Sequence, residues 1–524
     1  MTKTWPSPSG TPSTLLSLPR RVRRSAGPRL AVCACLSAML TACAMGPDYV
    51  RPTVASGVEF KEAAGWKAAE PRDDAHRGPW WEVFGDPDLS RLMAQVETAN
   101  QTIAQAEAQY RQALAVVRAS RAGQFPTLSG SASATRSGTG TQSSTTTNSS
   151  GVIISQGGSQ SIRNQYNLGV SASWEADLWG SIRRTVEADT ASAQASAANL
   201  ANAHLSAQAE LARNYFQLRI MDEQQRLLDA TIKVYERSLR LNENRYAVGV
   251  AAKAEIAQAR TQLETTRAQA IDLRWQRAQL EHAIAILVGQ PPSSFSIPSA
   301  DFRAVLPAVP VGLPSELLER RPDIAAAERQ VQAANARIGV TQAAYFPSLT
   351  LSASLGYRSA QFADWLTAPA RFWSLGPALA APLFDAGLRR AQTRQAEAAY
   401  DLQVATYRQT VLSALEEVEN YLSQLRVMEE EQVVQQRALD AARESLRLTT
   451  NQFESGLIDY LNVVSVQTAA LSNERTALSL LGNRLTASVN LIAALGGGWH
   501  ADALAASGNP GSESPGPSPQ PASP

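Results

Sequence analysis

Residues 166–178 read YNLGVSASWEADL, and this stretch decides the fold class. Apolar side chains occupy every second position from Tyr166 to Leu178, and small or polar residues occupy most of the positions between them. Because side chains alternate between the two faces of a β-strand, this pattern predicts a strand with one apolar and one hydrophilic face. Its length suits a tilted strand that crosses a membrane, which needs about 9 to 11 residues.

Three other stretches repeat this alternation. Leu349 to Tyr357 shows it clearly, and residues 128–134 and 373–383 show it more weakly. Together they predict two strand hairpins, at 125–178 and 346–384. A half-buried soluble sheet is the default interpretation of a single such strand. Four strands with a small, hydrophilic second face favour a transmembrane β-barrel with a water-filled lumen.

Four strands per chain cannot close a barrel. Single-chain membrane barrels begin at about eight strands. An open sheet edge in lipid leaves backbone groups unpaired, at a cost of several kcal/mol each. A spanning sheet therefore requires oligomerisation, and two, three or four copies would each supply enough strands. The residues alone do not choose among these numbers.

The chain also repeats itself. Residues 238–241 (SLRL) recur at 445–448, and residues 125–128 (FPTL) recur as FPSL at 346–349. An aromatic-x-x-Gly turn ending at Gly249 recurs at Gly456. These recurrences predict an internal duplication, with the following division: first repeat 100–290, proline-rich connection 291–322, second repeat 323–498. The extra residues of the first repeat fall in 135–165, a Ser/Thr/Gly-rich segment that we expect to be a loop between two strands.

Most of the remaining sequence predicts helices. Residues 181–248 lack proline and are rich in good helix formers, which predicts a helix about 100 Å long. Residues 387–455 are its repeat. The return helices, 252–288 and 459–495, measure about 55 Å each, and the helices 100–123 and 323–344 about 35 Å each. Two short helices end to end nearly match one long helix, which predicts a long coiled coil. A purely structural coiled coil remains open for this part.

The N-terminus has the layout of a secretory signal. Five arginines between positions 20 and 29 precede the 13-residue apolar run Leu30 to Ala42. A membrane anchor is the alternative, but a spanning helix needs about 20 residues. Residues 1–42 are therefore predicted to be a signal peptide. Cys33 and Cys35 leave with it, so Cys43 is the sole thiol of the mature chain and no internal disulfide can form.

Charge and composition exclude several classes of function. Removal of the signal leaves 42 basic and 47 acidic residues, a balance that gives no support to nucleic-acid binding. No catalytic or metal-ligating constellation is apparent, and an enzyme is not predicted. The four histidines are scattered along the chain: His76, His204, His282 and His500. Residues 499–524 are rich in Ser, Pro and Gly and are predicted to be disordered.

At this point the sequence resembles a known family. Leu-Thr-Ala-Cys43 looks like a bacterial lipoprotein signal, and GPDYVRP follows at 46–52. The long and specific segment LPSELLERRPDI occupies 313–324, and YFPSL occupies 345–349. Over residues 40–498 the chain is similar to TolC-like outer membrane factors, in the lipoprotein branch often called the NodT family. These are the outer channels of tripartite resistance-nodulation-division efflux pumps.

The resemblance implies an α+β membrane protein closed as a homotrimer, with a twelve-stranded transmembrane β-barrel and a periplasmic helical tunnel. It implies a passive exit duct for drugs or other small molecules, coupled through a periplasmic adaptor to an inner-membrane transporter. Two alternatives stay open. One is an outer channel for type I protein secretion, and the other is a lipid-anchored periplasmic scaffold that does not span the membrane.

The resemblance also implies where lipid is attached. In such lipoproteins the peptide is cut before Cys43, which then carries a diacylglycerol on its thiol and an acyl chain such as palmitate on its nitrogen. The segment 43–99 is expected to be the lipid-anchored N-terminal part. Ala44 favours delivery to the outer membrane, where an aspartate would favour retention in the inner one. No other cofactor is expected.

The helical turns are the expected contact sites for the adaptor. Glycine after a long helix suits the left-handed residue that commonly ends it. The residues expected to touch the adaptor are Val248, Gly249, Val250, Ser455, Gly456 and Leu457. Relatives narrow the tunnel with acidic residues just past the turns, where this chain has Glu255 and Asp459. Asn462 and Ser465 replace further acids. An alternative role for both carboxylates is simple stabilisation of a helix start.

Overall fold

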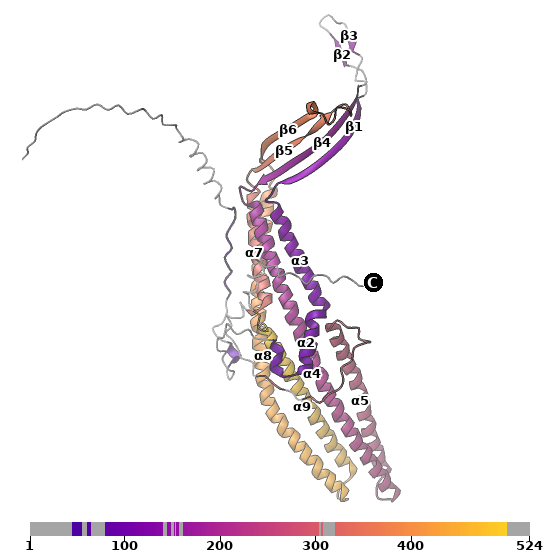
Figure 1. Ribbon diagram of the computed structural model, residues 1–524. Helices are drawn as coiled ribbons and strands as arrows, with labels where there is room; N and C mark the ends of the chain where they lie inside the picture. Colours follow the sequence, from indigo (N-terminus) through magenta and orange to yellow (C-terminus); the bar gives the residue numbers. More distant parts are fainter. Residues whose placement is uncertain are drawn as a thin grey trace, which may run out of the picture.

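The computed structural model describes residues 44–54, 60–63, 79–139, 144–147, 151, 153–156, 161–302, 305–307 and 320–499. The molecule is elongated, with a β-sheet at one end and two pairs of helices reaching to the other (Figure 1). The predictions for the signal peptide, for Cys43 and for residues 500–524 lie outside the described residues. Within the described ranges, no helix combines the length and the apolar character needed to cross a membrane.

The described helices and strands follow the predicted order. The helices are η1 (Lys61–Ala63), η2 (Trp80–Phe84), α2 (Pro87–Ala99), α3 (Gln101–Ala122), α4 (Ser181–Ala247), α5 (Lys253–Leu287), α7 (Pro322–Ala343), η4 (Ala368–Ala370), α8 (Leu388–Glu454) and α9 (Tyr460–Ala494). The strands are β1 (Thr127–Thr139), β2 (Ser144–Thr147), β3 (Ile153–Gln156), β4 (Ser161–Ala176), β5 (Ser348–Ser359) and β6 (Arg371–Ala380).

Strands β1, β4, β5 and β6 form one antiparallel sheet in that order. The two halves of the chain therefore meet along β4 and β5. Val170 lies opposite Gly130 on β1 and Leu355 on β5, and Leu355 lies opposite Trp373 on β6. Because residues directly opposite in such a sheet share a face, the apolar positions of all four strands lie on the same side.

The other face of the sheet is hydrophilic. A row of serines crosses all four strands, formed by Ser129, Ser171, Ser354 and Ser374. The hydroxyl oxygens of Ser354 and Ser374 lie 2.8 Å apart and share a hydrogen bond. This row is one residue away from the apolar row of Val170, so a shift of one residue in register would exchange the two faces.

The expectation of a loop over 135–165 was wrong in part. β1 continues to Thr139, β4 already begins at Ser161, and β2 and β3 pair with each other as a separate two-stranded sheet. Threonine and isoleucine are β-branched and favour strands, and threonine makes up most of β2 while two isoleucines begin β3. The Ser/Thr/Gly-rich composition therefore contains strand formers as well as turn formers.

The two halves of the helical body have matching dimensions. α4 and α8 have 67 residues each, α5 and α9 have 35 each, and α3 and α7 have 22 each. At 1.5 Å per residue, the longest are about 100 Å long. The segment 43–99, expected only as a lipid-anchored part, also contains η1, η2 and α2.

Short helices meet end to end in both halves. At the end of α5, Gly289 has φ +71°, and a Cβ there would lie 2.3 Å from the Ala99 carbonyl oxygen. The Asn100 side chain, which caps α3, donates a 2.8 Å hydrogen bond to the Leu287 carbonyl oxygen. At the end of α9, Gly496 approaches Arg320 in the same way. These contacts align α5 with α3 and α9 with α7.

Small residues let the long helices pack closely. Ala195 and Ala198 on α4 and Ala336 on α7 are fully buried, and short side chains reduce the distance between packed helices. Larger side chains form a hydrophobic core in the middle of the molecule, where the ring centres of Phe84 and Phe216 lie 4.8 Å apart. Alanine packing therefore holds the end near the sheet, and larger side chains hold the middle.

Candidate functional site

The apolar face of the sheet is exposed to the surroundings. On β6, Trp373 and Leu375 are 74% and 75% exposed, and Leu379 is also exposed. Exposed apolar side chains occur on the other three strands at Leu128, Ile162, Leu168, Val170, Leu351 and Leu355. A contiguous apolar surface of this kind marks contact with a membrane or with another protein. The serine row covers the opposite face, so the sheet can separate an apolar from an aqueous phase.

Two helical turns form the end opposite the sheet (Figure 1). Gly249 follows α4 and Gly456 follows α8, both with φ +78°, the left-handed region that glycine adopts without strain. A Cβ at either glycine would meet nothing within 4 Å. Val248, Val250 and Leu457 are exposed. Each turn therefore presents apolar surface beside a glycine that has open space where a side chain would stand.

The structure joins the two turns through a contact that the sequence did not reveal. The Arg245 guanidinium donates a 3.1 Å hydrogen bond to the Phe453 carbonyl oxygen and lies 4.6 Å from the centre of its ring. The Phe453 ring in turn lies 5.4 Å from that of the buried Tyr460. The sequence shows two aromatic residues near Gly456, Phe453 and Tyr460. Arg245, which contacts Phe453, lies in the other half of the chain and has no spacing that points to it.

The two carboxylates past the turns have different surroundings. Glu255 accepts a 3.1 Å hydrogen bond from the Ala252 backbone N–H, so it caps the start of α5. Asp459 precedes α9, and its side chain forms no capping hydrogen bond. Asn462 lies in the first turn of α9, and its backbone N–H donates a 3.2 Å hydrogen bond to the Asp459 carbonyl oxygen. The alternative role, in which the carboxylate stabilises the start of a helix, therefore fits Glu255 better than Asp459.

Comparison with known proteins agrees with this architecture. The sequence model of the outer membrane efflux protein family matches residues 92–290 and 313–497. The chain belongs to the outer membrane efflux protein family. It is 32% identical over 473 residues to the pyoverdine export outer membrane protein OpmQ of Pseudomonas aeruginosa, covering 90% of this chain and 97% of that one. The efflux function and the outer membrane location predicted from the sequence are confirmed.

Other relatives add detail. The probable outer membrane lipoprotein SilC of Salmonella typhimurium is 28% identical over 461 residues, covering 87% of this chain and 95% of SilC. The solved outer-membrane channel OprN is 31% identical, with a TM-score of 0.79 over 87% of this chain and all of that chain. The open-state MtrE channel of Neisseria gonorrhoeae has a TM-score of 0.76 at 28% identity, over 87% of this chain and 99% of MtrE. A long helical body with a smaller β-domain is thus the family fold.

Residues 44–54 of the efflux protein form a strap across the helices next to the sheet. The Met45 N–H donates to the Trp179 carbonyl oxygen at 3.0 Å, and the buried Arg184 contacts the Met45 carbonyl oxygen at 3.1 Å and Asp48 at 2.9 Å. Tyr49 donates a 3.2 Å hydrogen bond to Glu328. Burial, reinforced by this carboxylate, raises the pKa of the Tyr49 hydroxyl, which keeps it a proton donor. The strap thereby joins α4 to α7.

Glycine is required where the strap crosses α7. Gly46 has φ +102°, and a Cβ there would lie 2.4 Å from the Gly339 Cα. We expect Gly46→Ala to detach the strap and to accelerate hydrogen exchange at the Met45 amide at least about tenfold, which corresponds to about 1.4 kcal/mol. Gly85→Ala is the matched control, because Gly85 also has positive φ but a Cβ there meets nothing within 4 Å. Equal protection of Met45 in both variants would contradict this role for Gly46.

A buried ionic network fixes the connection after α5. Arg219 and Asp222 on α4 are each only 2% exposed. Asp222 accepts hydrogen bonds from Arg277 on α5 at 2.7 Å and from Arg219 at 3.3 Å. Arg219 also donates to the Pro298 carbonyl oxygen at 2.9 Å, and Arg277 donates to that of Ile297 at 2.6 Å. The proline-rich connection is therefore bound to the helices by charged side chains.

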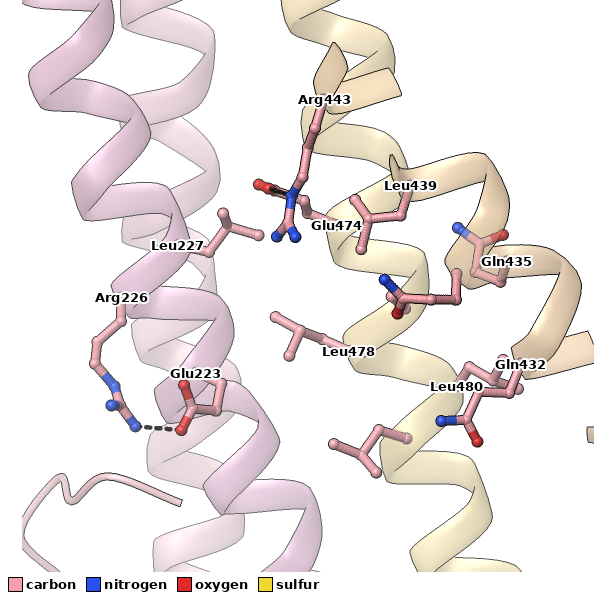
Figure 2. A pocket seen from close by; sticks show the side chains of 13 residues that line it. Glu223, Arg226, Leu227, Gln432, Gln435, Leu439, Arg443, Glu474, Leu478 and Leu480 are labelled. Carbon is pink, nitrogen blue, oxygen red and sulfur yellow. Dashed lines mark hydrogen bonds and ion pairs between the residues drawn. The ribbon is translucent and has the colours of Figure 1, made fainter. Parts of the chain in front are cut away.

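A cavity of about 530 Å³ lies between α4 and the α8–α9 pair (Figure 2). Leu227 and Leu439 contribute apolar surface, while Gln435 and the Arg443–Glu474 ion pair, 2.8 Å between nitrogen and oxygen, contribute polar surface. Among the described residues, no group of three or more His, Cys, Asp or Glu is arranged to hold a metal ion.

Proposed function

We propose that three copies of this chain form a passive exit duct from the periplasm to the outside of the cell. The two-faced four-stranded sheet carries the proposal, because its exposed apolar face and its serine row suit lipid on one side and water on the other. Three copies would supply twelve strands and pair the free edges of β1 and β6, which are unpaired in one chain. The helices would continue the duct through the periplasm.

The matching helices support an internal duplication. Because α3, α4 and α5 have the lengths of α7, α8 and α9, three chains would present six similar helical hairpins, with two kinds alternating. We propose that Val248, Gly249, Val250, Ser455, Gly456 and Leu457 contact a periplasmic adaptor, which couples the duct to an inner-membrane resistance-nodulation-division transporter. The exposed apolar side chains beside each glycine suit such a partner.

Lipid attachment is proposed at Cys43. The strap seats Ala44 against Gly180 at the junction of β4 and α4, since a Cβ at Gly180 would lie 2.9 Å from the Ala44 Cα. Cys43 immediately precedes Ala44 in the sequence. Acyl chains there would enter the periplasmic leaflet of the outer membrane, beside the near end of the sheet. The relative SilC, described as a probable outer membrane lipoprotein, supports this lipid anchor.

Conductance in planar bilayers, with the mass of the purified protein in detergent, tests the duct. We expect a trimer with small, discrete openings. We propose that Glu255 and Asp459, which lie just past the turns, narrow the periplasmic end of the duct. Replacing Glu255 by glutamine and Asp459 by asparagine is therefore expected to enlarge the openings or increase their frequency. Glutamine can still accept the Ala252 N–H, so the cap on α5 is retained while the charge is removed.

Glu107→Gln is the matched control, since Glu107 is an exposed carboxylate on α3, far from the turns. It should leave the openings unchanged. A monodisperse, folded monomer that never conducts would contradict the duct and favour the lipid-anchored scaffold. Trimers whose openings respond equally to Glu107→Gln and to the double variant would contradict the placement of the constriction at the turns.

A further inference from the structure

The end of the sheet farthest from the helices carries an unbalanced positive charge. Residues 127–174 and 348–380 contain four arginines, no lysine and a single acid, Asp364. Each arginine lies toward this distal end of a different strand, at Arg136 on β1, Arg163 on β4, Arg358 on β5 and Arg371 on β6. All four side chains are exposed. One carboxylate cannot neutralise four guanidinium groups.

The register divides the four arginines equally between the two faces. Arg358 lies opposite Asn167, and Asn167 lies opposite Ser133, on the hydrophilic face. Arg163 lies opposite Ser137 on the same face. Arg371 lies opposite Tyr357, and Arg136 lies opposite Asn164, on the apolar face. The arginines thus form two pairs at two levels along the strands, Arg163 with Arg136 and Arg358 with Arg371. In each pair, the first arginine lies on the hydrophilic face and the second on the apolar face.

The Arg358 side chain is held on the hydrophilic face by two contacts. Its Nε donates a 2.9 Å hydrogen bond to the Asn167 side-chain oxygen. Its guanidinium carbon lies 4.8 Å from the ring centre of Phe372, where the cation is attracted by the π face. The Phe372 ring in turn covers Gly356, where a Cβ would lie 3.0 Å from ring carbon Cε1. The arginine is thus positioned over the sheet, with its remaining N–H groups available.

We infer that Arg163 and Arg358 form a cationic collar at the outer mouth of the duct that favours anionic solutes. This inference rests on the proposed function, in which the hydrophilic face lines the lumen. Three chains would place six guanidinium groups around one opening. Like charges that surround a confined opening focus the field and concentrate counter-ions there. The collar therefore favours the passage of anions such as carboxylates, sulfonates and phosphates over that of cations.

The collar is tested with a thiol placed inside it. Ser133→Cys puts a sulfur in the row of Asn167 and Arg358, and the purified trimer is treated with a sulfonate-bearing or a trimethylammonium-bearing methanethiosulfonate. The quantity measured is the ratio of the anionic to the cationic modification rate. At about 10 mM salt, where the Debye length is about 30 Å, removing the collar with Arg163→Gln and Arg358→Gln should lower this ratio about 3- to 10-fold.

The matched control removes the same charge from the other face. Arg136→Gln with Arg371→Gln acts at the same two levels and should change the ratio by less than half as much. The effect of the collar should vanish at about 1 M salt, where the Debye length is about 3 Å. A ratio that falls equally in both double variants, or in neither, would overturn the collar while leaving the duct intact.

A second thiol separates failure of the collar from failure of the duct. Ala134→Cys lies next to Ser133 on β1 but on the apolar face, opposite Tyr166. In the proposed trimer it is covered by detergent or lipid and should react far more slowly than Ser133→Cys. The two cysteine variants are compared with all four arginines retained. If both thiols react equally fast, the hydrophilic face does not line a separate lumen, and the proposed function is overturned together with the collar.

Discussion

Replacing Asp222 by alanine is expected to lower the free energy of unfolding by about 3–5 kcal/mol, the loss typical of breaking a buried ion pair. The carboxylate holds both Arg219 and Arg277, and Arg219 is 2% exposed. Without Asp222, Arg219 would keep the Pro298 carbonyl oxygen and a 3.3 Å contact to Asp88. These partners do not replace the lost charge in the interior. Urea denaturation in detergent, followed by circular dichroism, measures the loss.

Glu444→Ala is the matched control for this prediction. Glu444 also pairs with an arginine three residues away, Arg447, at 2.7 Å, but both side chains are more than half exposed. We expect no measurable change, because exposed ion pairs contribute little. Asp222→Asn covers the case in which the alanine variant does not fold, since the amide can still accept one hydrogen bond. Equal stability of Asp222→Asn and Glu444→Ala would show that the network is not a determinant of stability.

Val170→Arg is expected to prevent insertion of the sheet into the outer membrane. Val170 lies in the apolar row between Gly130 and Leu355, and the side chain is exposed in one chain. An arginine on the lipid face of a barrel costs about 2–4 kcal/mol per chain at the middle of the bilayer, and a trimer would carry three. The readout is the amount of heat-resistant trimer in purified outer membranes.

Ser171→Arg introduces the same side chain one residue away, in the serine row of the other face. We expect it to insert nearly as well as the unaltered protein, because a hydrated lumen accepts charge. The difference between the two neighbouring substitutions isolates the effect of the face from that of the arginine itself. Insertion of both variants at equal levels, or failure of Ser171→Arg alone, would contradict the assignment of the two faces.

Local patterns in the sequence predicted most of the fold. Period-two alternation placed the strands, and uninterrupted runs of helix formers placed α4 and α8 within a residue or two of their ends. The expectation of a loop over 135–165 failed at the ends of this segment, where β1 and β4 continue, and in its middle, where β2 pairs with β3. Composition alone does not reveal such strand pairing. Local patterning is strong for long elements and weak for short, mixed ones.

The site was less predictable, because its contacts join distant parts of the chain. The turns at Gly249 and Gly456 were visible as recurring motifs. Their link through Arg245 and Phe453 was not, since neither residue has a spacing that points to the other. The roles of Arg184 in the strap and of Arg358 in the collar likewise depend on register and packing between the two halves. Such pairings exist only once the tertiary structure is known.

The pairing of β4 with β5 also determines the order in which the chain can fold. β5 and β6 can form a hairpin within about 35 residues, but Tyr166 and Ser359, which lie opposite each other, are about 190 positions apart. Closing so long a loop has an entropic cost that few early contacts offset. The packing of α4 against α7 brings the two hairpins together and lowers that cost. The helical body should therefore assemble before the sheet is complete, and until then each hairpin exposes unpaired edges on which chaperones and other copies of the chain can act.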